Sequence, residues 1–117
     1  MTEVLAASPH DYVPVLFTTC IEESLAFYND VLGFRITDNC CNFRVLHAGR
    51  FFDVISTDDP GLTNGAIILY FAELENFRSR VLNRGVAIFE NTAVLYEYSN
   101  LAIKDPDQNT IYCFVSH

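Results

Sequence analysis

The residues best suited to chemistry in this chain are three histidines and one glutamate, and their spacing does not favour catalysis. His10, His47 and His117 each lack a His or Glu partner two or four residues away, which a preformed metal site would contain. We therefore predict surface histidines rather than metal ligands. Glu97 lies between two tyrosines and is a candidate base, although a solvated carboxylate at the rim of a site is the commoner outcome. The sequence has no Gly-x-Ser-x-Gly motif and no cysteine–histidine spacing typical of an activated nucleophile.

Aromatic residues on the predicted strands favour binding instead. Side chains two residues apart on a strand share a face, so Asp53 shares one with Phe51 and Ile55, and Tyr112 shares one with Phe114. Further aromatic candidates for the same surface are Tyr96, Tyr98, Phe43 and Tyr70. An aromatic face beside a carboxylate attracts a cation, because the ring quadrupole contributes about 0.5–2 kcal/mol and the anion adds opposite charge. The alternative is that these rings simply fill the core.

The composition is that of one small acidic domain. Half of the 117 residues are hydrophobic, with 10 Phe and 6 Tyr, which is enough for a core without a metal or a disulfide. The net charge of −8 and the lack of a basic stripe disfavour nucleic acids and anionic membranes as partners. The same charge attracts cationic small molecules, although an acidic surface often serves solubility alone.

The sequence also lacks the patterns of export, redox and zinc sites. No stretch approaches the ~20 apolar residues of a membrane span, and the first residues do not resemble a secretory signal. The four cysteines form no C-x-x-C pair, so we predict free thiols in a cytoplasmic protein without a cofactor.

Two parts of the chain show the same order of predicted elements. The first, about residues 9–57, comprises a strand at 12–17, a helix at 21–32 and strands at 34–37, 42–46 and 51–55. The second, about residues 65–117, comprises a strand at 66–71, a helix at 74–84 and strands at 86–89, 93–98, 101–104 and 110–115. Thr19 and Glu22 form a predicted capping box, and Gly33 and Gly85 end the two helices. The repeat predicts a single α+β domain over residues 1–117, built from two tandem βαβββ modules.

Two motifs resemble those of the vicinal oxygen chelate superfamily, which contains glyoxalases, extradiol dioxygenases and the fosfomycin- and bleomycin-resistance proteins. Residues 15–34, VLFTTCIEESLAFYNDVLGF, are similar to its opening, a strand followed by a Ser-x-x-Phe-Tyr helix and Leu-Gly-Phe. The segment Asp105-Pro106-Asp107-Gln108-Asn109 is similar to the Asp-Pro-Asp-Gly-Asn turn before the last strand of that family. Gln108 replaces the usual Gly, and we expect Asn109 to provide the left-handed backbone.

The resemblance covers residues 12–117 and implies curved mixed sheets around a cleft. It is nearest in pattern to the short bleomycin-resistance branch, in which two chains pair so that each cleft draws on both. This implies a homodimer with C2 symmetry.

The resemblance also bears on the divalent metal that the superfamily's enzymes bind. Counted from the two motifs, the metal-binding positions fall on Val13, near Asn64, on Asp53 and on Tyr112. Of these, Asp53 is the one carboxylate, whereas a catalytic site needs about three protein ligands. The resemblance therefore implies a metal-free cleft in which Val13 and Tyr112 pack against a ligand.

These observations lead to two main functional predictions. The first is a metal-independent binding protein that sequesters a cationic or amphipathic aromatic compound in a dimer cleft, as a drug-resistance protein would. The predicted ligand-binding residues are Val13, Phe43, Phe51, Asp53, Tyr70, Tyr96, Tyr98 and Tyr112. The second is a metal-dependent lyase, isomerase or dioxygenase with a rearranged site that uses Asp53 and either His47 or Glu97. A ligand sensor that acts through a protein partner is a third alternative, for which the sequence offers no partner surface.

Overall fold

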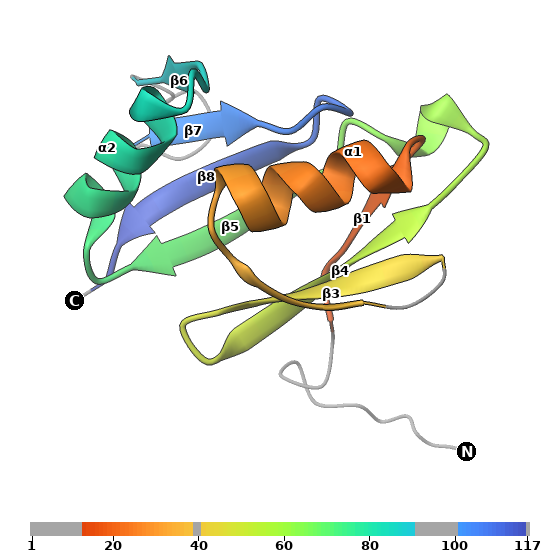
Figure 1. The fold of residues 1–117 in the computed structure, drawn as a ribbon, viewed down its shortest axis with the longest axis horizontal. Coiled ribbons are helices and arrows are strands. Elements are labelled where there is room, and N and C mark those ends of the chain that lie inside the picture. Colours follow the sequence, from red (N-terminus) through yellow and green to blue (C-terminus); the bar gives the residue numbers. More distant parts are fainter. Residues whose placement is uncertain (1–12, 39–40, 91–100, 117) are drawn as a thin grey trace.

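Two four-stranded sheets, with helices packed against them, make up the fold (Figure 1). The computed structural model describes residues 13–38, 41–90 and 101–116. The strand order is β1-β4-β3-β2 in the first sheet and β5-β8-β7-β6 in the second. In each sheet the first pair is parallel and the other pairs are antiparallel. Each sheet corresponds to one sequence module, so the predicted α+β class and the βαβββ repeat are confirmed.

The element boundaries agree with the predicted ones to within a few residues. The first module contains β1 (Val15–Thr18), α1 (Ile21–Ala26), the π-helical turn η2 (Phe27–Val31), β2 (Arg35–Asp38), β3 (Asn42–His47) and β4 (Arg50–Ser56). After the 3-10 turn η3 (Pro60–Leu62), the second contains β5 (Ala66–Phe71), α2 (Leu74–Asn83), β6 (Ile88–Phe89), β7 (Leu101–Lys104) and β8 (Thr110–Val115). The strand predicted at 93–98 lies outside the described residues. Within the described segments, no helix is long and apolar enough to cross a membrane.

The first helix begins differently from the prediction. Thr19 does not cap it, because the Thr19 N–H and Oγ1 both donate to Asp107 Oδ1 in the second module, each at 2.9 Å. Cys20 is the N-cap residue, and its side chain makes no capping hydrogen bond. The predicted capping box is therefore wrong, since a tertiary contact has taken the hydroxyl that would have closed it.

The end of this helix widens into the π-helical turn. That turn buries Tyr28 and is followed by buried Leu32, whereas Ile21 and Leu25 from the same predicted stripe are only half-buried. Gly33 then adopts a positive φ of 77°, which is the left-handed cap predicted from its position.

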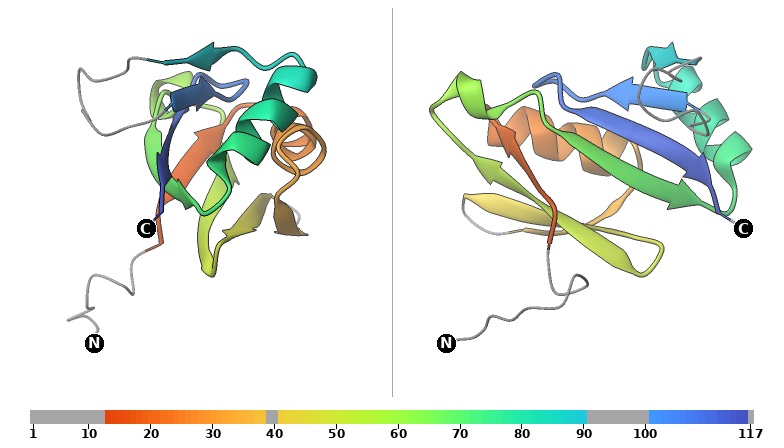
Figure 2. Two further views of the ribbon diagram at one scale, coloured as in Figure 1. Left: turned by 90° about the vertical axis from the view of Figure 1, so that its left-hand side faces the viewer. Right: turned by 180° about the vertical axis from the view of Figure 1, so that it is seen from behind.

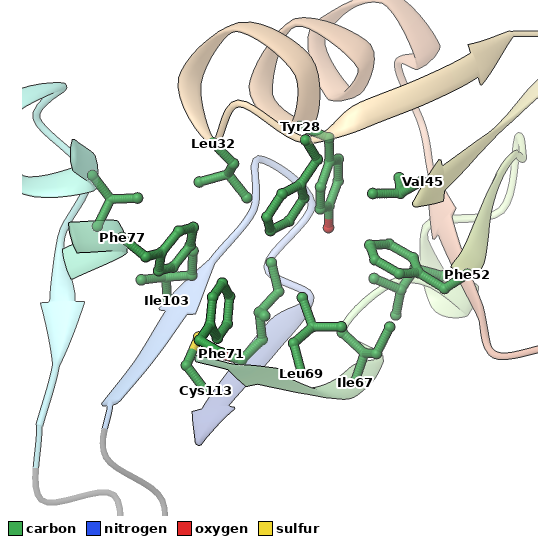
Figure 3. Close-up of a cluster of buried hydrophobic side chains, with 14 of the residues drawn as sticks. Tyr28, Leu32, Val45, Phe52, Ile67, Leu69, Phe71, Phe77, Ile103 and Cys113 are labelled. Atoms are coloured by element: carbon green, nitrogen blue, oxygen red, sulfur yellow. The ribbon is translucent and has the colours of Figure 1, made fainter. Parts of the chain in front are cut away.

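The two modules share one hydrophobic core (Figure 3). Phe34 of the first module lies 5.8 Å from Phe77 and 6.4 Å from Phe71 of the second, measured between ring centroids. Phe71 and Phe77 stack on each other at 4.3 Å. Along β4 the burial alternates, so that Phe52 is buried in this core while Phe51 points away from it.

The turn at residues 105–109 connects the second module to the first through side-chain hydrogen bonds. Buried Asp105 accepts a hydrogen bond from the Tyr28 hydroxyl at 2.7 Å, and Asn109 donates from Nδ2 to the backbone carbonyl of Phe17 at 3.0 Å. Asn109 Oδ1 also accepts a hydrogen bond from the Gly65 N–H at 2.7 Å. Burial, together with the neighbouring Asp105 carboxylate, raises the pKa of Tyr28 well above its ordinary value, so the hydroxyl keeps the proton that it donates.

The left-handed residue in this turn is Gln108, with a φ of 68°, and not Asn109 as predicted. Asn109 is committed to other contacts, because its N–H donates to Asp105 Oδ1 and its Nδ2 donates to Asp105 Oδ2, both at 2.9 Å. The residue that replaces the usual glycine thus takes the conformation that glycine would have.

Candidate ligand-binding site

Each sheet has an outer face, which we define as the face turned away from the shared core. In the first sheet the outer face includes Val15, Phe17, Arg35, Arg44, Leu46, Phe51, Asp53 and Ile55. In the second it includes Ile68, Tyr70, Lys104, Thr110, Tyr112 and Phe114. Large side chains on both faces are exposed, Phe51 to 41% and Tyr70 to 51%. Contiguous exposed apolar surface of this kind commonly marks an interaction site.

A groove of about 920 Å³ lies between the β3–β4 hairpin, the start of β1 and strand β5. The right-hand view of Figure 2 shows this hairpin extending beneath β5. Ala48 and Gly49 form its tip, and both have a positive φ, which is the conformation that a tight two-residue hairpin turn requires. The groove falls within the range of cavities that hold drug-sized molecules.

The structure brings three of the predicted site residues together. Val13, Phe51 and Tyr70 all line the groove. Asp53 and Tyr112 lie on the outer faces but do not line it. The Tyr70 ring also lies 5.5 Å from the ring of Phe114, centroid to centroid, so an aromatic pair extends the groove wall onto the outer face of the second sheet.

The remaining predicted ligand-binding residues are Phe43, Tyr96 and Tyr98. Phe43 is only 1% exposed and its ring contacts Tyr28 in the core at 6.0 Å, so its place among the ligand-binding residues was wrong. Its β3 neighbours show why: the residues of β3 that alternate with it, not Phe43 itself, face outward. Tyr96 and Tyr98, and the candidate base Glu97, lie outside the described residues.

Arg44 does not line the groove itself, but it contacts the lining residue Phe51, and the sequence reasoning missed it. Its Nε and Nη2 donate to the two oxygens of Asp53 at 2.7 and 3.0 Å, a bidentate ion pair across the β3–β4 ladder. Its Cζ also lies 4.1 Å from the centroid of the Phe51 ring, in cation–π geometry. The hydrogen bond to Asp53 raises the pKa of Arg44, so the guanidinium stays charged. Asp53 is therefore not the unpaired carboxylate that the sequence suggested.

His47 lines the groove at the point where the two modules meet. Its Nε2 lies 2.8 Å from the backbone carbonyl of Tyr70, which can only accept, so Nε2 carries the proton. Its ring lies 4.3 Å from that of Phe71 and 5.1 Å from that of Phe34, between centroids. Burial among these rings lowers the pKa of His47, although the hydrogen bond to Tyr70 acts in the opposite direction. The sequence predicted a surface histidine, whereas this side chain is half-buried and joins the two modules.

This lowered pKa predicts a specific loss of stability in acid. Below the ordinary value of 6.5 the unfolded chain binds a proton at His47 that the folded chain resists, so the stabilisation is complete above that pH and is lost as the pH falls. We expect the free energy of unfolding to fall more steeply between pH 7 and pH 5 in the parent protein than in His47→Gln. Glutamine keeps an N–H donor for Tyr70 but does not titrate. Urea unfolding at several pH values measures both slopes, and equal slopes would contradict the prediction.

Comparisons with known proteins place this geometry in a known fold. No family profile matches the sequence, and no curated protein does. Solved structures do match. The antibiotic-binding protein TnmS3 from Streptomyces sp. CB03234 has 18% identity, with 97% of this chain and 99% of that chain covered and a TM-score of 0.71. A bleomycin-binding protein in complex with bleomycin has 17% identity over 91% of this chain and 98% of that chain, with a TM-score of 0.73. A bleomycin-binding protein from Streptomyces verticillus, in complex with copper(II)-bleomycin, has 16% identity over 91% and 95%, with a TM-score of 0.72.

The chain has the glyoxalase/bleomycin-resistance fold. The two motifs that suggested this fold have structural roles in it. The Ser-x-x-Phe-Tyr helix supplies Tyr28, and the Asp-Pro-Asp turn supplies the buried carboxylate that Tyr28 contacts.

The resemblance to the vicinal oxygen chelate superfamily raises the question of a divalent metal, which the enzymes of that superfamily bind. The residues described here do not fit such a metal. No group of three or more His, Cys, Asp or Glu side chains gathers anywhere in the described segments. Among the positions expected to bind it, Val13 has no donor atom and Asn64 is an exposed residue with a φ of 66°. Both oxygens of Asp53 accept hydrogen bonds from Arg44, so an ion there would compete with a guanidinium. The arrangement therefore does not favour the rearranged metal site that would use Asp53.

Proposed function

We propose that this chain is a metal-independent binding protein that sequesters an amphipathic aromatic compound. The observation that carries the proposal is the groove in which Val13, Phe51 and Tyr70 meet. Flat aromatic ligands suit such walls, because they bury apolar area and stack on the rings without requiring a reactive group. The similarity to TnmS3 and to the bleomycin-binding proteins supports a small-molecule ligand and a drug-resistance-like role.

The proposal includes a second copy of the chain. Val15, Leu46 and Phe51 on one outer face and Ile68 and Tyr70 on the other leave apolar area in water when the chain is alone. Pairing two copies with C2 symmetry would cover these faces and enclose the groove, so that both chains line each cleft. The resemblance to the bleomycin-resistance branch supports the same arrangement.

The sequence predicted either a cationic or an amphipathic aromatic ligand, and the contacts of Asp53 favour the amphipathic one. A cationic ligand was to be neutralised by Asp53, but that carboxylate already holds Arg44 in a bidentate pair. Among the described residues, a cation would therefore depend on the rings of Tyr70 and Phe114. We therefore propose the amphipathic aromatic ligand.

The experiment compares aromatic with saturated probes and measures the oligomeric state. We expect 2-naphthamide to bind in calorimetry about two- to tenfold more tightly than its saturated analogue, because stacking on exposed rings contributes about 0.5–1.5 kcal/mol beyond area burial. Sedimentation velocity should show a dimer at micromolar concentration. Equal affinities for the two compounds would contradict an aromatic site. A monomer at every concentration would contradict the two-chain cleft.

A further inference from the structure

The charges on the outer faces have the opposite sign to the charge of the whole chain. The chain carries −8 overall, yet its described outer faces present Arg35, Arg44 and Lys104 against the single carboxylate of Asp53. Asp53 is neutralised by Arg44. The described residues of the outer faces therefore carry more cations than anions, which favours acidic compounds over basic ones near these faces.

Among these cations, Arg44 is the one whose charged group is fixed by contacts with other described residues. The ion pair with Asp53 fixes one edge of its guanidinium, and Phe51 supports its flat face with Cζ 4.1 Å from the ring centroid. The contacts with Asp53 use Nε and Nη2, and no hydrogen bond from Nη1 is found within the described part of the chain. The side chain is still 42% exposed, so Nη1 can meet a solvent-borne acceptor. A guanidinium prepared in this way loses little rotamer entropy when it binds an acceptor.

Phe51 connects this cation to the groove. Its ring lines the groove while Arg44 lies over it, so a planar ligand beside Phe51 would have its edge near the guanidinium. Carboxylate, sulfonate and phenolate oxygens are the acceptors that form the strongest hydrogen bonds with arginine.

We propose that Arg44 orients the ligand, and that the ligand is an acidic aromatic compound whose anionic oxygen accepts a hydrogen bond from Arg44 Nη1. This inference rests on the proposed binding function and names the chemical class of its ligand. Asp53 is then a positioning residue, which holds the guanidinium and does not itself touch the ligand.

The experiment uses three probes of one shape and different charge. They are 2-naphthoate, 2-naphthamide and 2-naphthylmethylammonium, titrated into the full chain by calorimetry at low and high salt. We expect naphthoate to bind about tenfold more tightly than naphthamide. Both oxygens can accept a hydrogen bond from Arg44, but the carboxylate adds the attraction of opposite charges, about 1 kcal/mol at ~4 Å in water and more near a protein surface. The ammonium compound should bind most weakly, and added salt should reduce the preference for naphthoate.

Substitutions test whether Arg44 itself, or only the positive charge of the outer face, causes the preference for naphthoate. Arg44→Met should remove the naphthoate preference and leave naphthamide affinity within about twofold, whereas Arg35→Met removes the same charge from the same face and should keep the preference. The double variant Arg44→Met/Asp53→Asn removes the pair without leaving an uncompensated carboxylate, and it should behave like Arg44→Met.

A preference that survives in Arg44→Met, or tightest binding of the ammonium probe, would overturn the assignment of Arg44. Equal binding of all three probes by the parent protein would overturn this inference but keep the proposed function. No binding of any probe would overturn both.

Discussion

Replacing Asn109 by alanine is expected to lower the free energy of unfolding by about 3–5 kcal/mol. The side chain is fully buried and makes three hydrogen bonds, to the carbonyl of Phe17, to Asp105 Oδ2 and from the N–H of Gly65. Alanine removes all three and leaves one buried and two half-buried partners without their bonds, and a buried group left in this way costs about 1–3 kcal/mol before relaxation. Because these bonds connect β1, the start of β5 and the 105–109 turn, the loss should act on both modules together. Urea unfolding followed by circular dichroism measures it.

An exposed asparagine is the matched control, because it shows how much an Asn→Ala substitution changes the free energy of unfolding without the buried contacts. Asn76 is exposed on α2 and makes one side-chain hydrogen bond, from Nδ2 to Glu73 Oε1 at 3.1 Å. Asn76→Ala should change the free energy of unfolding by less than about 0.5 kcal/mol, since alanine also favours the helix. A loss below about 1 kcal/mol for Asn109→Ala would show that the turn does not hold the modules together as described.

Phe71→Ala is expected to cost about 3–5 kcal/mol of stability as well, for a different reason. Phe71 is 5% exposed and its ring contacts those of Phe34, His47 and Phe77, so alanine would open a cavity at the junction of the modules. The adjacent Tyr70 points the other way and is the matched control. Tyr70→Ala should lower stability by about 1 kcal/mol or less and should weaken binding of 2-naphthamide by about tenfold.

The two measurements on adjacent residues test the assignment of the two faces. Chemical unfolding gives the stability of each variant, and calorimetry gives the affinity. The His47 contact to the carbonyl of Tyr70 is a backbone contact and survives the Tyr70 substitution. If Tyr70→Ala were as destabilising as Phe71→Ala, or if it left naphthamide affinity unchanged, the outer face would not be the binding surface.

Local patterns in the sequence predicted most of the fold. Gly33 was predicted to end a helix because left-handed backbone favours glycine, and its φ of 77° confirms this. Alternation along β4 correctly separated Phe51 and Asp53 from the core. Thr19 was mispredicted because its partner, Asp107, lies 88 residues away, and a capping motif is a local signal that cannot include such a contact.

The site was less predictable, because its features depend on the register between strands. Arg44 pairs with Asp53 since β3 and β4 place them directly opposite each other, and the sequence alone does not give that alignment. Phe43 was assigned to the wrong face for a related reason: alternation divides a strand into two faces without saying which one is inward. The pair of Arg44 and Asp53 also argues against a cationic ligand, because a carboxylate that is already paired with a guanidinium attracts a second cation weakly.

We propose above all that the groove binds an aromatic compound without a metal and without changing it. The most direct measurement is calorimetric titration of 2-naphthoate into the full chain after dialysis against EDTA, followed by chromatography of the recovered compound. We expect the same affinity before and after EDTA, and we expect all of the naphthoate to be recovered unchanged. Binding that disappears with EDTA and returns with zinc, nickel, manganese or iron would contradict it, as would conversion of the compound to a product.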